Sequence, residues 1–241
     1  MKRIDARANN ELRPISIQTG YQVYAEGSAL IEAGNTRVLC AVTMEDRVPA
    51  FLKGHGTGWI TAEYAMLPRS THVRTPRRSV AEGTAGRSLE IQRLIGRSLR
   101  AVTDLTAIGE RTFTIDCDVL QADGGTRTAA ITGAYVALYN AFYRLKELGI
   151  LAQIPFTSMV AAVSVGIVDR EQLLDLCYQE DFAASVDFNV VMTDKGHFVE
   201  LQGTAEGKPF SRETVDSIVS LAEDGIRQLF VIQKEAIKQF S

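Results

Sequence analysis

The chain has 241 residues, of which 46% are hydrophobic and 23% are charged, the composition of a globular protein with a core of its own. No apolar run approaches the about 18 residues that cross a bilayer, and no apolar stretch follows the charged N-terminus, so we expect neither a membrane span nor a secretory signal. Three cysteines without C-x-x-C spacing argue against a disulfide framework and a zinc site, and favour a cytoplasmic protein: Cys40, Cys117 and Cys177.

Positive charge is concentrated in one segment, although the whole chain has a net charge of −3. Between residues 69 and 100, eight arginines, two acids and no lysine give a charge of +6, which leaves −9 for the remainder. Guanidinium groups bind phosphate oxygens in a bidentate way, so the segment favours an anionic partner over its alternative, a solvated charged loop and helix. The arginines are Arg69, Arg74, Arg77, Arg78, Arg87, Arg93, Arg97 and Arg100.

Short β-branched and aromatic runs, separated by glycines, predict several strands at the start of the chain. The glycine-rich segment 53–58 is expected to be a loop. The polar, arginine-rich segment 68–83 is expected to be a long loop that is either functional or disordered. The predicted strands are 15–17, 21–24, 29–31, 38–42 and about 59–66.

A helix is predicted from Ser88 to about Val102, because its apolar residues recur with amphipathic spacing. Three arginines share the opposite face, where like charges repel by a few tenths of a kcal/mol per pair, so an external anion would relieve them. The predicted apolar residues are Leu89, Ile91, Leu94, Ile95 and Leu99, and the arginines are Arg93, Arg97 and Arg100.

An alternating strand at 113–120 is followed by a turn and a long helix, and further strands are predicted at 157–169 and about 184–203. A last helix starts near Ser211, a good N-cap. The order of strands, helix, strand, helix, strands and helix predicts a mixed α/β fold with two similar halves. No boundary carries a flexible linker, so residues 1–241 are expected to form a single domain. The apolar face of the long helix is expected to be Ile131, Tyr135, Leu138, Phe142 and Leu145.

Two glycine-plus-arginine sequences stand at predicted helix starts. In Gly124-Gly125-Thr126-Arg127, the glycines let backbone N–H groups approach an anion, and the helix start adds unpaired donors and a favourable dipole. The alternative is an ordinary glycine turn with a threonine cap. Arg87, which follows Gly86, could share one phosphate with Arg127.

Asp181 and Asp187 form an acidic pair close to a predicted strand, on which Ser185, Asp187 and Asn189 share one face. In a straight strand the two carboxylates would be roughly 20 Å apart, too far to share Mg²⁺, which holds its ligand oxygens at about 2 Å. Joint action therefore requires a turn or bulge near Asp181. The alternative is a pair of solvent-facing acids on an exposed strand face.

Six motifs closely resemble the RNase PH family of phosphorolytic 3′→5′ exoribonucleases, and the resemblance spans essentially the whole chain. A minor departure, Ser88-Leu89 where the family often has Thr-Met, touches no charged site residue. The motifs are residues 3–7, 12–14, 87–100, 116–127, 180–193 and 202–207.

The resemblance implies a ribosomal-protein-S5-domain-2-like α/β (α+β) fold, with mixed sheets, packed helices and two similar β-α-β-α halves. It implies an enzyme, a tRNA nucleotidyltransferase that trims the 3′ ends of precursor tRNA and other RNA, including rRNA. Inorganic phosphate is the co-substrate, nucleoside 5′-diphosphates are released, and the reaction is reversible. The resemblance also implies a cytoplasmic homohexamer, a trimer of dimers.

For the site, the resemblance implies that Arg87, Gly125, Thr126 and Arg127 bind the attacking phosphate. Asp181 and Asp187 would be the catalytic acids, holding Mg²⁺ (or Mn²⁺) or protonating the leaving 3′ oxygen. The arginines expected to contact RNA are Arg69, Arg74, Arg77, Arg78, Arg93 and Arg97.

Three other functions compete with this interpretation. A non-catalytic, RNA-binding ring subunit of an exosome-like complex would share the fold, but such subunits commonly lose the site residues that are present here. A metal-dependent hydrolytic nuclease would leave the paired arginine sites without a role. A small-molecule kinase is disfavoured because Gly203–Pro209 only partly matches a phosphate-binding loop, with Pro209 where Ser or Thr should bind Mg²⁺.

Overall fold

A five-stranded sheet is formed by the N-terminal half of the chain in the computed structural model, which describes residues 3–77 and 86–240. Its strands are β1 (Ile15–Thr19), β2 (Gly27–Ala33), β3 (Thr36–Glu45), β4 (Trp59–Met66) and β5 (Thr112–Gln121), and a 3-10 turn at Ala50–Leu52 precedes β4. The strand order is β1-β2-β3-β5-β4, and all neighbours are antiparallel except β4 and β5. Because parallel strands need a crossover connection, helix α1 (Gly86–Arg100) lies between β4 and β5 in the chain and packs on β4.

The C-terminal half forms a second, four-stranded antiparallel sheet. Its strands are β6 (Val160–Val168), β7 (Glu171–Leu174), β8 (Val186–Thr193) and β9 (Phe198–Ala205), in the order β7-β6-β8-β9. The short helix α3 (Tyr178–Ala183) connects β7 to β8. This connection places a helical turn directly before β8, which is the strand that carries Asp187.

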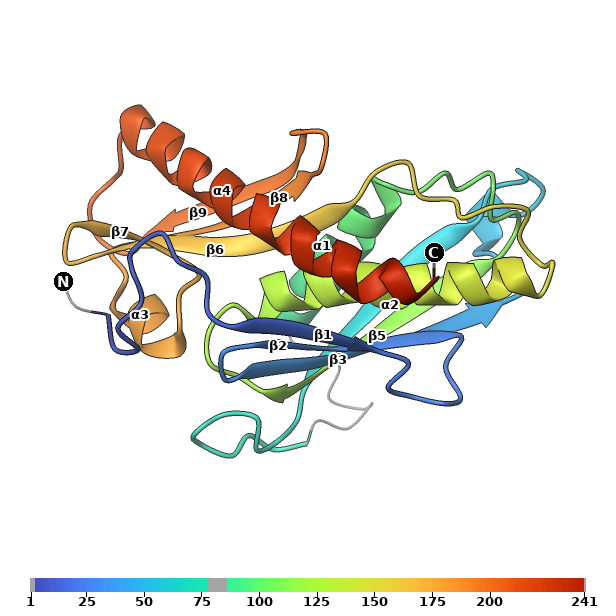
Figure 1. The fold of residues 1–241 in the computed structure, drawn as a ribbon, viewed down its shortest axis with the longest axis horizontal. Coiled ribbons are helices and arrows are strands. Elements are labelled where there is room, and N and C mark those ends of the chain that lie inside the picture. The colour runs from blue at the N-terminus through green and yellow to red at the C-terminus, as the bar shows by residue number, and fades with distance from the viewer. Residues whose placement is uncertain (1–2, 78–85, 241) are drawn as a thin grey trace.

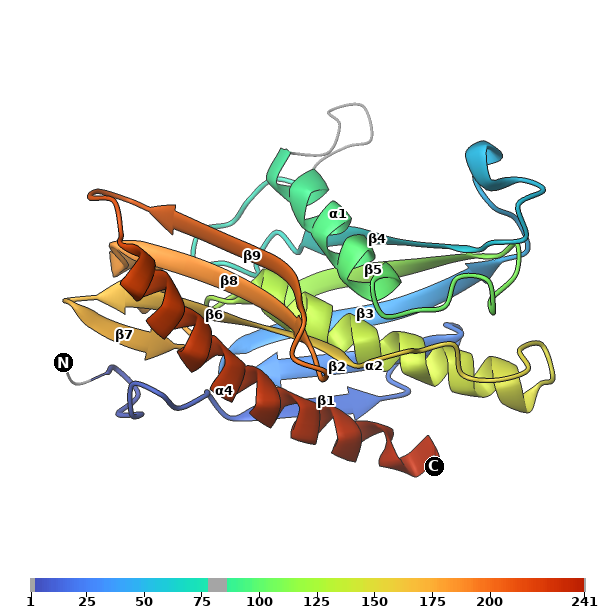
Figure 2. The same ribbon diagram turned by 90° about the horizontal axis from the view of Figure 1, so that it is seen from above.

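Two long helices join the sheets: α2 (Thr126–Glu147) and α4 (Arg212–Ile237), which ends in a 3-10 turn at Lys238–Phe240. Helix α2 lies between the sheets and packs on β2 and β3 of the first and on β6 of the second (Figures 1 and 2). Every residue from Thr128 to Leu138 is buried, as expected for a helix enclosed on all sides. Helix α4 packs across β6 and β1 and also touches α2.

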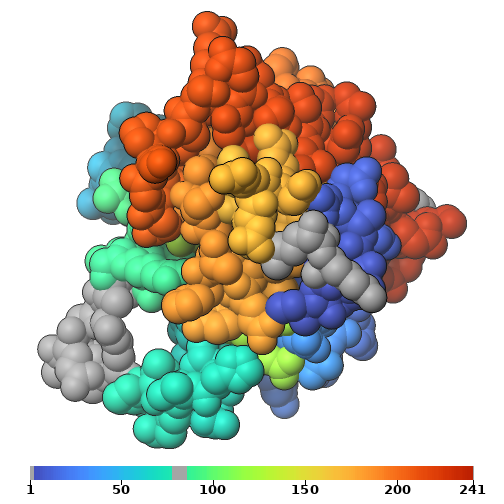
Figure 3. Space-filling view, turned by 90° about the vertical axis from the view of Figure 1, so that its left-hand side faces the viewer, coloured from blue at the N-terminus to red at the C-terminus, as the bar shows by residue number. Residues whose placement is uncertain are grey.

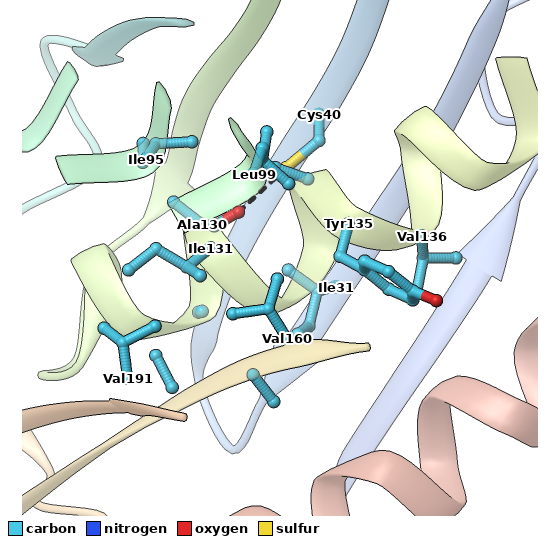
Figure 4. Close-up of a cluster of buried hydrophobic side chains, with 14 of the residues drawn as sticks. Ile31, Cys40, Ile95, Leu99, Ala130, Ile131, Tyr135, Val136, Val160 and Val191 are labelled. Atoms are coloured by element: carbon cyan, nitrogen blue, oxygen red, sulfur yellow. Dashed lines mark hydrogen bonds between the residues drawn. The ribbon is translucent and has the colours of Figure 1, made fainter. Parts of the chain in front are cut away.

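One core cluster runs through both sheets and around α2. In it, the thiol of Cys40 on β3 donates to the carbonyl of Ala130 on α2 at 3.8 Å (Figure 4). All three cysteines are free and buried. Side chains from both sheets and two helices meet in the same cluster, among them Ile31, Leu99, Ile131, Tyr135, Val160 and Val191. The two sheets therefore share their interior through α2.

The predicted fold class is confirmed, because the structure is a mixed α/β arrangement of two sheets and packed helices. The strand predicted at about 59–66 is β4, and the last helix begins after Ser211, whose hydroxyl accepts a hydrogen bond from the Thr214 N–H at 3.3 Å. Among the described residues, no helix is long and apolar enough to span a membrane.

Two local predictions were wrong. Residues 21–24 do not form a strand but belong to the loop between β1 and β2, where Val23 is 82% exposed and Tyr24 fully exposed. The pairing of Thr19 with Ala29 leaves this segment beyond the end of the hairpin, where the Gln22 N–H donates to the Ser28 hydroxyl at 2.7 Å instead of to a strand carbonyl. Leu89 is 46% exposed because the first turn of α1 projects from the sheet (Figure 2). The buried residues of this helix start at Ile91.

Candidate active site

The turn between β5 and α2 contains two glycines in the left-handed region, with φ of +75° at Gly124 and +62° at Gly125. A Cβ on Gly124 would lie 2.4 Å from the carbonyl oxygen of Leu176, and a Cβ on Gly125 would lie 3.0 Å from the Arg13 guanidinium. Only glycine combines this backbone conformation with this close approach. The turn is therefore packed against the segment that leads into α3, and the start of α2 lies next to it.

Thr126, the first residue of α2, is bonded to Tyr64 on β4. The Tyr64 hydroxyl donates to Thr126 Oγ1 at 2.8 Å, which leaves the hydrogen of the Thr126 hydroxyl available to an anion. Burial raises the pKa of Tyr64, and the hydrogen bond to Thr126 and the charges of Arg87 and Arg127 offset only part of that rise. Tyr64 therefore stays a protonated donor at neutral pH.

Arg127 is held by residues from two other elements. Its guanidinium donates to the Gln202 side-chain oxygen on β9 at 2.7 Å and lies 3.6 Å from the Glu90 carboxylate on α1. Gln202 in turn donates to Glu90 at 2.7 Å. These contacts fix the guanidinium beside the glycine turn and join α1, α2 and β9 at the site.

Arg87 is the second residue of α1 and lies at the surface. Burial raises the pKa of both Tyr64 and Asp181, and the positive charges of Arg87 and Arg127 offset part of each rise. The Arg127 guanidinium lies 3.6 Å from the carboxylate of Glu90, which is three residues after Arg87 on α1. The structure thus brings together the two arginine-bearing helix starts that the sequence places 40 residues apart.

Helix α3 supplies the turn that Asp181 and Asp187 need in order to act together. Asp181 lies on α3, the chain then turns at Ala184, and Asp187 follows on β8, so the two acids are not on one straight strand. Burial raises the pKa of Asp187, and the negative charge of Asp181 raises it further, while Arg127 opposes the shift. Burial also raises the pKa of Asp181, and Arg87 and Arg127 offset part of the rise. The two carboxylates therefore act on each other beside the arginines.

The donor set suits a divalent cation that is held by few protein ligands. Two carboxylates with raised pKa values would lose their mutual repulsion if a cation lay between them. Mg²⁺ usually keeps several waters and binds through one or two carboxylates plus substrate phosphates. Across the described ranges, no group of three or more His, Cys, Asp or Glu residues is placed to enclose a metal.

A buried ion pair anchors α3. Arg3 donates from Nε and Nη2 to the two carboxylate oxygens of Glu180 at 2.8 and 2.7 Å, and both side chains are buried. Glu180 also accepts from the Cys177 N–H at 3.1 Å, which caps the helix start. Burial raises the pKa of Glu180, but the bonds from Arg3 and Cys177 outweigh burial and hold that pKa below its ordinary value. The residue next to Asp181 is thereby fixed in a single position.

A second buried pair anchors the glycine turn. Arg13 donates from Nη2 to one carboxylate oxygen of Asp175 at 2.7 Å and from Nε to the other at 3.0 Å. The same guanidinium donates to the Asp123 carbonyl at 2.5 Å. Burial raises the pKa of Asp175, but the charge and hydrogen bonds of Arg13 outweigh it and lower the pKa overall. Because Asp175 lies between β7 and α3, this pair ties the phosphate turn to the segment that carries Asp181.

The other arginines of the basic segment have different surroundings. Arg69, Arg74 and Arg77 are exposed on the loop after β4, and Arg78 lies outside the described residues. Arg93 is exposed on α1, roughly 9 Å along the helix from Arg87.

Arg97 and Arg100, whose charges were expected to repel along α1, each have a partner within the protein. Arg97 is paired with Glu200 on β9. Arg100 lies over the Trp59 ring, 4.3 Å from its centroid, and donates to the Ile60 carbonyl at 2.7 Å. An external anion is therefore not needed to separate these charges.

Several side chains of the site were not predicted to have a role in it. Tyr64 is one of several aromatic residues on predicted strands, and Gln202 and Glu90 lie within motifs 202–207 and 87–100 without a role that the motif assigns to them. Arg3 and Arg13 lie in the N-terminal motifs, but their partners Glu180 and Asp175 are more than 160 residues away. Spacing along the chain could not reveal contacts made only by the folded structure.

Comparisons with known proteins agree on one family. The model of the 3′ exoribonuclease family, domain 1, matches residues 11–143, and that of domain 2 matches residues 158–225. A curated protein named ribonuclease PH from Dehalococcoides mccartyi is 64% identical over 234 residues, which is 97% of each chain. A ribonuclease PH from Syntrophomonas wolfei subsp. wolfei is 58% identical, over 97% of this chain and 98% of that one.

Solved structures share the fold at lower identity. A chain of the Archaeoglobus fulgidus exosome with RNA bound to the active site matches with a TM-score of 0.81 and 22% identity, over 95% of this chain and 91% of that one. Rrp46 of rice (Oryza sativa) matches with a TM-score of 0.79 and 20% identity, over 99% of this chain and 100% of that one. At these identities the likeness concerns the fold alone.

Proposed function

This chain belongs to the RNase PH family of 3′ exoribonucleases, and from its site we propose how it carries out the reaction of that family. It is an RNA-binding enzyme of tRNA processing, a phosphate-dependent 3′→5′ exoribonuclease of the transferase type. The open questions are the roles of its residues, its metal and its assembly.

The attacking phosphate would bind between Arg87 and Arg127, with the Thr126 hydroxyl and the Gly125 turn completing the cradle. The observation that carries this proposal is that the two arginine-bearing helix starts meet, because the Arg127 guanidinium lies 3.6 Å from Glu90 in the first turns of α1. Phosphorolysis brings two anions together, so fixed cationic donors must offset their repulsion. Arg127 is already positioned by Gln202 and Glu90, which reduces the ordering needed when phosphate binds.

The reaction would transfer the terminal nucleotide from RNA to phosphate. A phosphate oxygen attacks the phosphorus of the last phosphodiester, the bond to the 3′ oxygen breaks, and the products are a nucleoside 5′-diphosphate and a shortened RNA. The leaving 3′ oxygen needs a proton, and Asp181 and Asp187 are the nearby acids whose raised pKa values favour carrying one. The phosphodiester bond is exchanged for the phosphoanhydride bond of the nucleoside diphosphate without loss to water, so an excess of nucleoside diphosphate would drive 3′ tailing.

In the alternative role of the pair, the ionised carboxylates of Asp181 and Asp187 would hold a divalent cation, Mg²⁺ or Mn²⁺. When bound, it would supply positive charge that stabilises the developing negative charge on the leaving oxygen. The support is the donor chemistry of two carboxylates whose repulsion a cation would remove.

RNA would approach along the exposed arginines Arg69, Arg74 and Arg77, with Arg93 further along α1. Arg97 would contribute less, since Glu200 already pairs with it.

We further propose that the chain works as one domain, because its core continues through both sheets. From the family resemblance we also propose that the chain assembles as a cytoplasmic homohexamer, built as a trimer of dimers, and that it takes part in rRNA processing.

Kinetics of Arg127→Ala test the phosphate site. Because hydrogen bonds to charged groups are worth about 1.5–3 kcal/mol, we expect the KM for phosphate to rise by about tenfold to a hundredfold, with a smaller change in the KM for RNA. Arg127→Lys should recover only part of the loss, since an ammonium cannot bind two oxygens in a planar fork. Arg227→Ala, on the exposed side of α4, is the matched control. An unchanged phosphate KM in Arg127→Ala would contradict the assignment.

A further inference from the structure

Helix α3 carries two exposed aromatic side chains beside Asp181. Phe182, the next residue, is 82% exposed, and Tyr178, one turn earlier, is 47% exposed. Their ring centroids are 6.3 Å apart, and residues three and four apart in a helix share one face. An apolar ring that buries so little contributes little to folding, so the core does not account for Phe182.

The aromatic surface continues onto the arginine-bearing loop. The ring of His72 lies 6.0 Å from that of Tyr178, so loop 67–77 contacts the start of α3. Figure 3 shows this loop, in teal, beside the orange surface that includes α3. Between Arg69 and Arg77 the loop has three arginines and no acidic residue. Aromatic faces and cationic side chains therefore lie next to each other, the combination that binds single-stranded nucleic acid.

Tyr178 also connects this surface to the phosphate turn. Its backbone N–H donates to the Asp123 carboxylate at 3.2 Å, and the same nitrogen would lie 2.8 Å from a Cβ on Gly124. A nucleotide whose phosphodiester lies at Asp181 would thus have aromatic rings within reach of its base.

We propose that Phe182 and Tyr178, flanked by His72, form a stacking platform for bases at the 3′ end of the RNA substrate. The inference rests on the proposed function, because it requires an RNA 3′ end at Asp181. Stacking tolerates every base, since each has a π face. An exonuclease that removes whichever nucleotide comes next needs such base-independent contact, which hydrogen bonds to base edges would not give.

The test is a binding measurement without phosphate, so that no turnover occurs. A short single-stranded RNA carries 2-aminopurine, whose fluorescence is quenched by stacking, as its 3′-terminal base. We expect Phe182→Ala to lose much of the quenching seen with the unmodified enzyme and to bind about tenfold more weakly, and Phe182→Trp to keep both properties. Phe182→Leu should resemble Phe182→Ala, because it keeps apolar volume but not the ring. Phe198→Ala, at a half-exposed phenylalanine on β9, is the matched control.

A second RNA, without a base on its last nucleotide, identifies the partner of the ring. It should bind the unmodified enzyme and Phe182→Ala with equal affinity. The loss of affinity caused by removing the base and the loss caused by removing the ring should therefore not add. Equal quenching and equal affinity of Phe182→Ala and the unmodified enzyme for the 2-aminopurine RNA would overturn the proposal. So would a change in subunit assembly in Phe182→Ala without loss of quenching, which would assign the ring to a contact between copies of the chain. The enzyme could also show quenching that depends on Phe182 but release no nucleoside diphosphate. That result would support the stacking platform and refute the proposed reaction.

Discussion

At the scale of single residues, the site keeps two acids close together at the expense of stability. Asp181 raises the pKa of Asp187, and burial raises the pKa of both. A carboxyl whose pKa is raised by folding binds its proton more tightly in the folded state. Its ionisation above that pKa therefore destabilises the folded protein, an arrangement typical of functional sites.

Asp187→Asn should therefore stabilise the protein while it removes activity. At neutral pH the neutral side chain abolishes the repulsion, and a gain within the about 0.5–2 kcal/mol usual for stabilising substitutions is expected. The gain should vanish below the ordinary pKa of 3.8, where the native aspartate is protonated in both states. Turnover should fall at least about a hundredfold, the contribution of a positioned acid.

Urea unfolding between pH 3 and pH 8 measures the stability change, with the exposed Asp216→Asn on α4 as control. If Asp187→Asn were less stable than the native chain at neutral pH, the carboxylates would not repel each other as described.

At the scale of elements, the short helix α3 depends on the N-terminal segment. Six residues are too few to form a stable helix alone, so its position comes from tertiary contacts. Glu180 on α3 is fixed by Arg3, and Asp175 just before it is fixed by Arg13. The N-terminal segment is thus a positioning device for Asp181, although it touches none of the proposed reacting atoms.

Arg3→Ala should lower both stability and turnover. Removing one partner leaves the buried Glu180 carboxylate unpaired, which typically costs about 3–5 kcal/mol. The pKa of Glu180 is lowered by folding, so this contribution is present above its ordinary value of 4.5 and is lost as the pH falls through the folded pKa. The stability difference between the native chain and Arg3→Ala should shrink accordingly in acid.

The kinetics of the same variants separate positioning from general loss of structure. Arg3→Lys keeps the charge without the fork and should be intermediate in stability. In the folded fraction of Arg3→Ala, kcat should fall while the KM for phosphate changes little, because Arg127 is held by other residues. A normal kcat in that fraction would show that α3 does not need this anchor.

At the scale of the whole molecule, local patterns predict the elements but not how distant elements meet. The strand at 59–66 and the helix after Ser211 follow from periodicity and a cap, and the structure has both. The site joins β4, β5, α1, α2, α3 and β9, whose neighbours are far apart in the chain. Asp181 shows why the site could not be predicted from local patterns. The position of its helix α3 depends on the contact between Arg3 and Glu180, which are 177 positions apart in the chain.

The proposed residue roles likewise depend on the family resemblance more than on spacing. Arg87 and Arg127 stand at helix starts that the pattern predicts, and the fold brings these two helix starts together through the contact of Arg127 with Glu90. Tyr64 bonds to Thr126, and Gln202 bonds to Arg127. These contacts can be recognised only in the folded structure, where strands β4 and β9 lie beside the start of α2.

The most direct test of the account is the identity of the released product. The purified chain is incubated with a 3′-extended tRNA and Mg²⁺, with and without inorganic phosphate, and nucleoside diphosphates are resolved from monophosphates. For a phosphorolytic reaction, we expect diphosphates that appear only with phosphate and that fall sharply in Arg127→Ala. Monophosphates released without phosphate would contradict it, because water would then be the attacking group and the paired arginines would have no phosphate to bind.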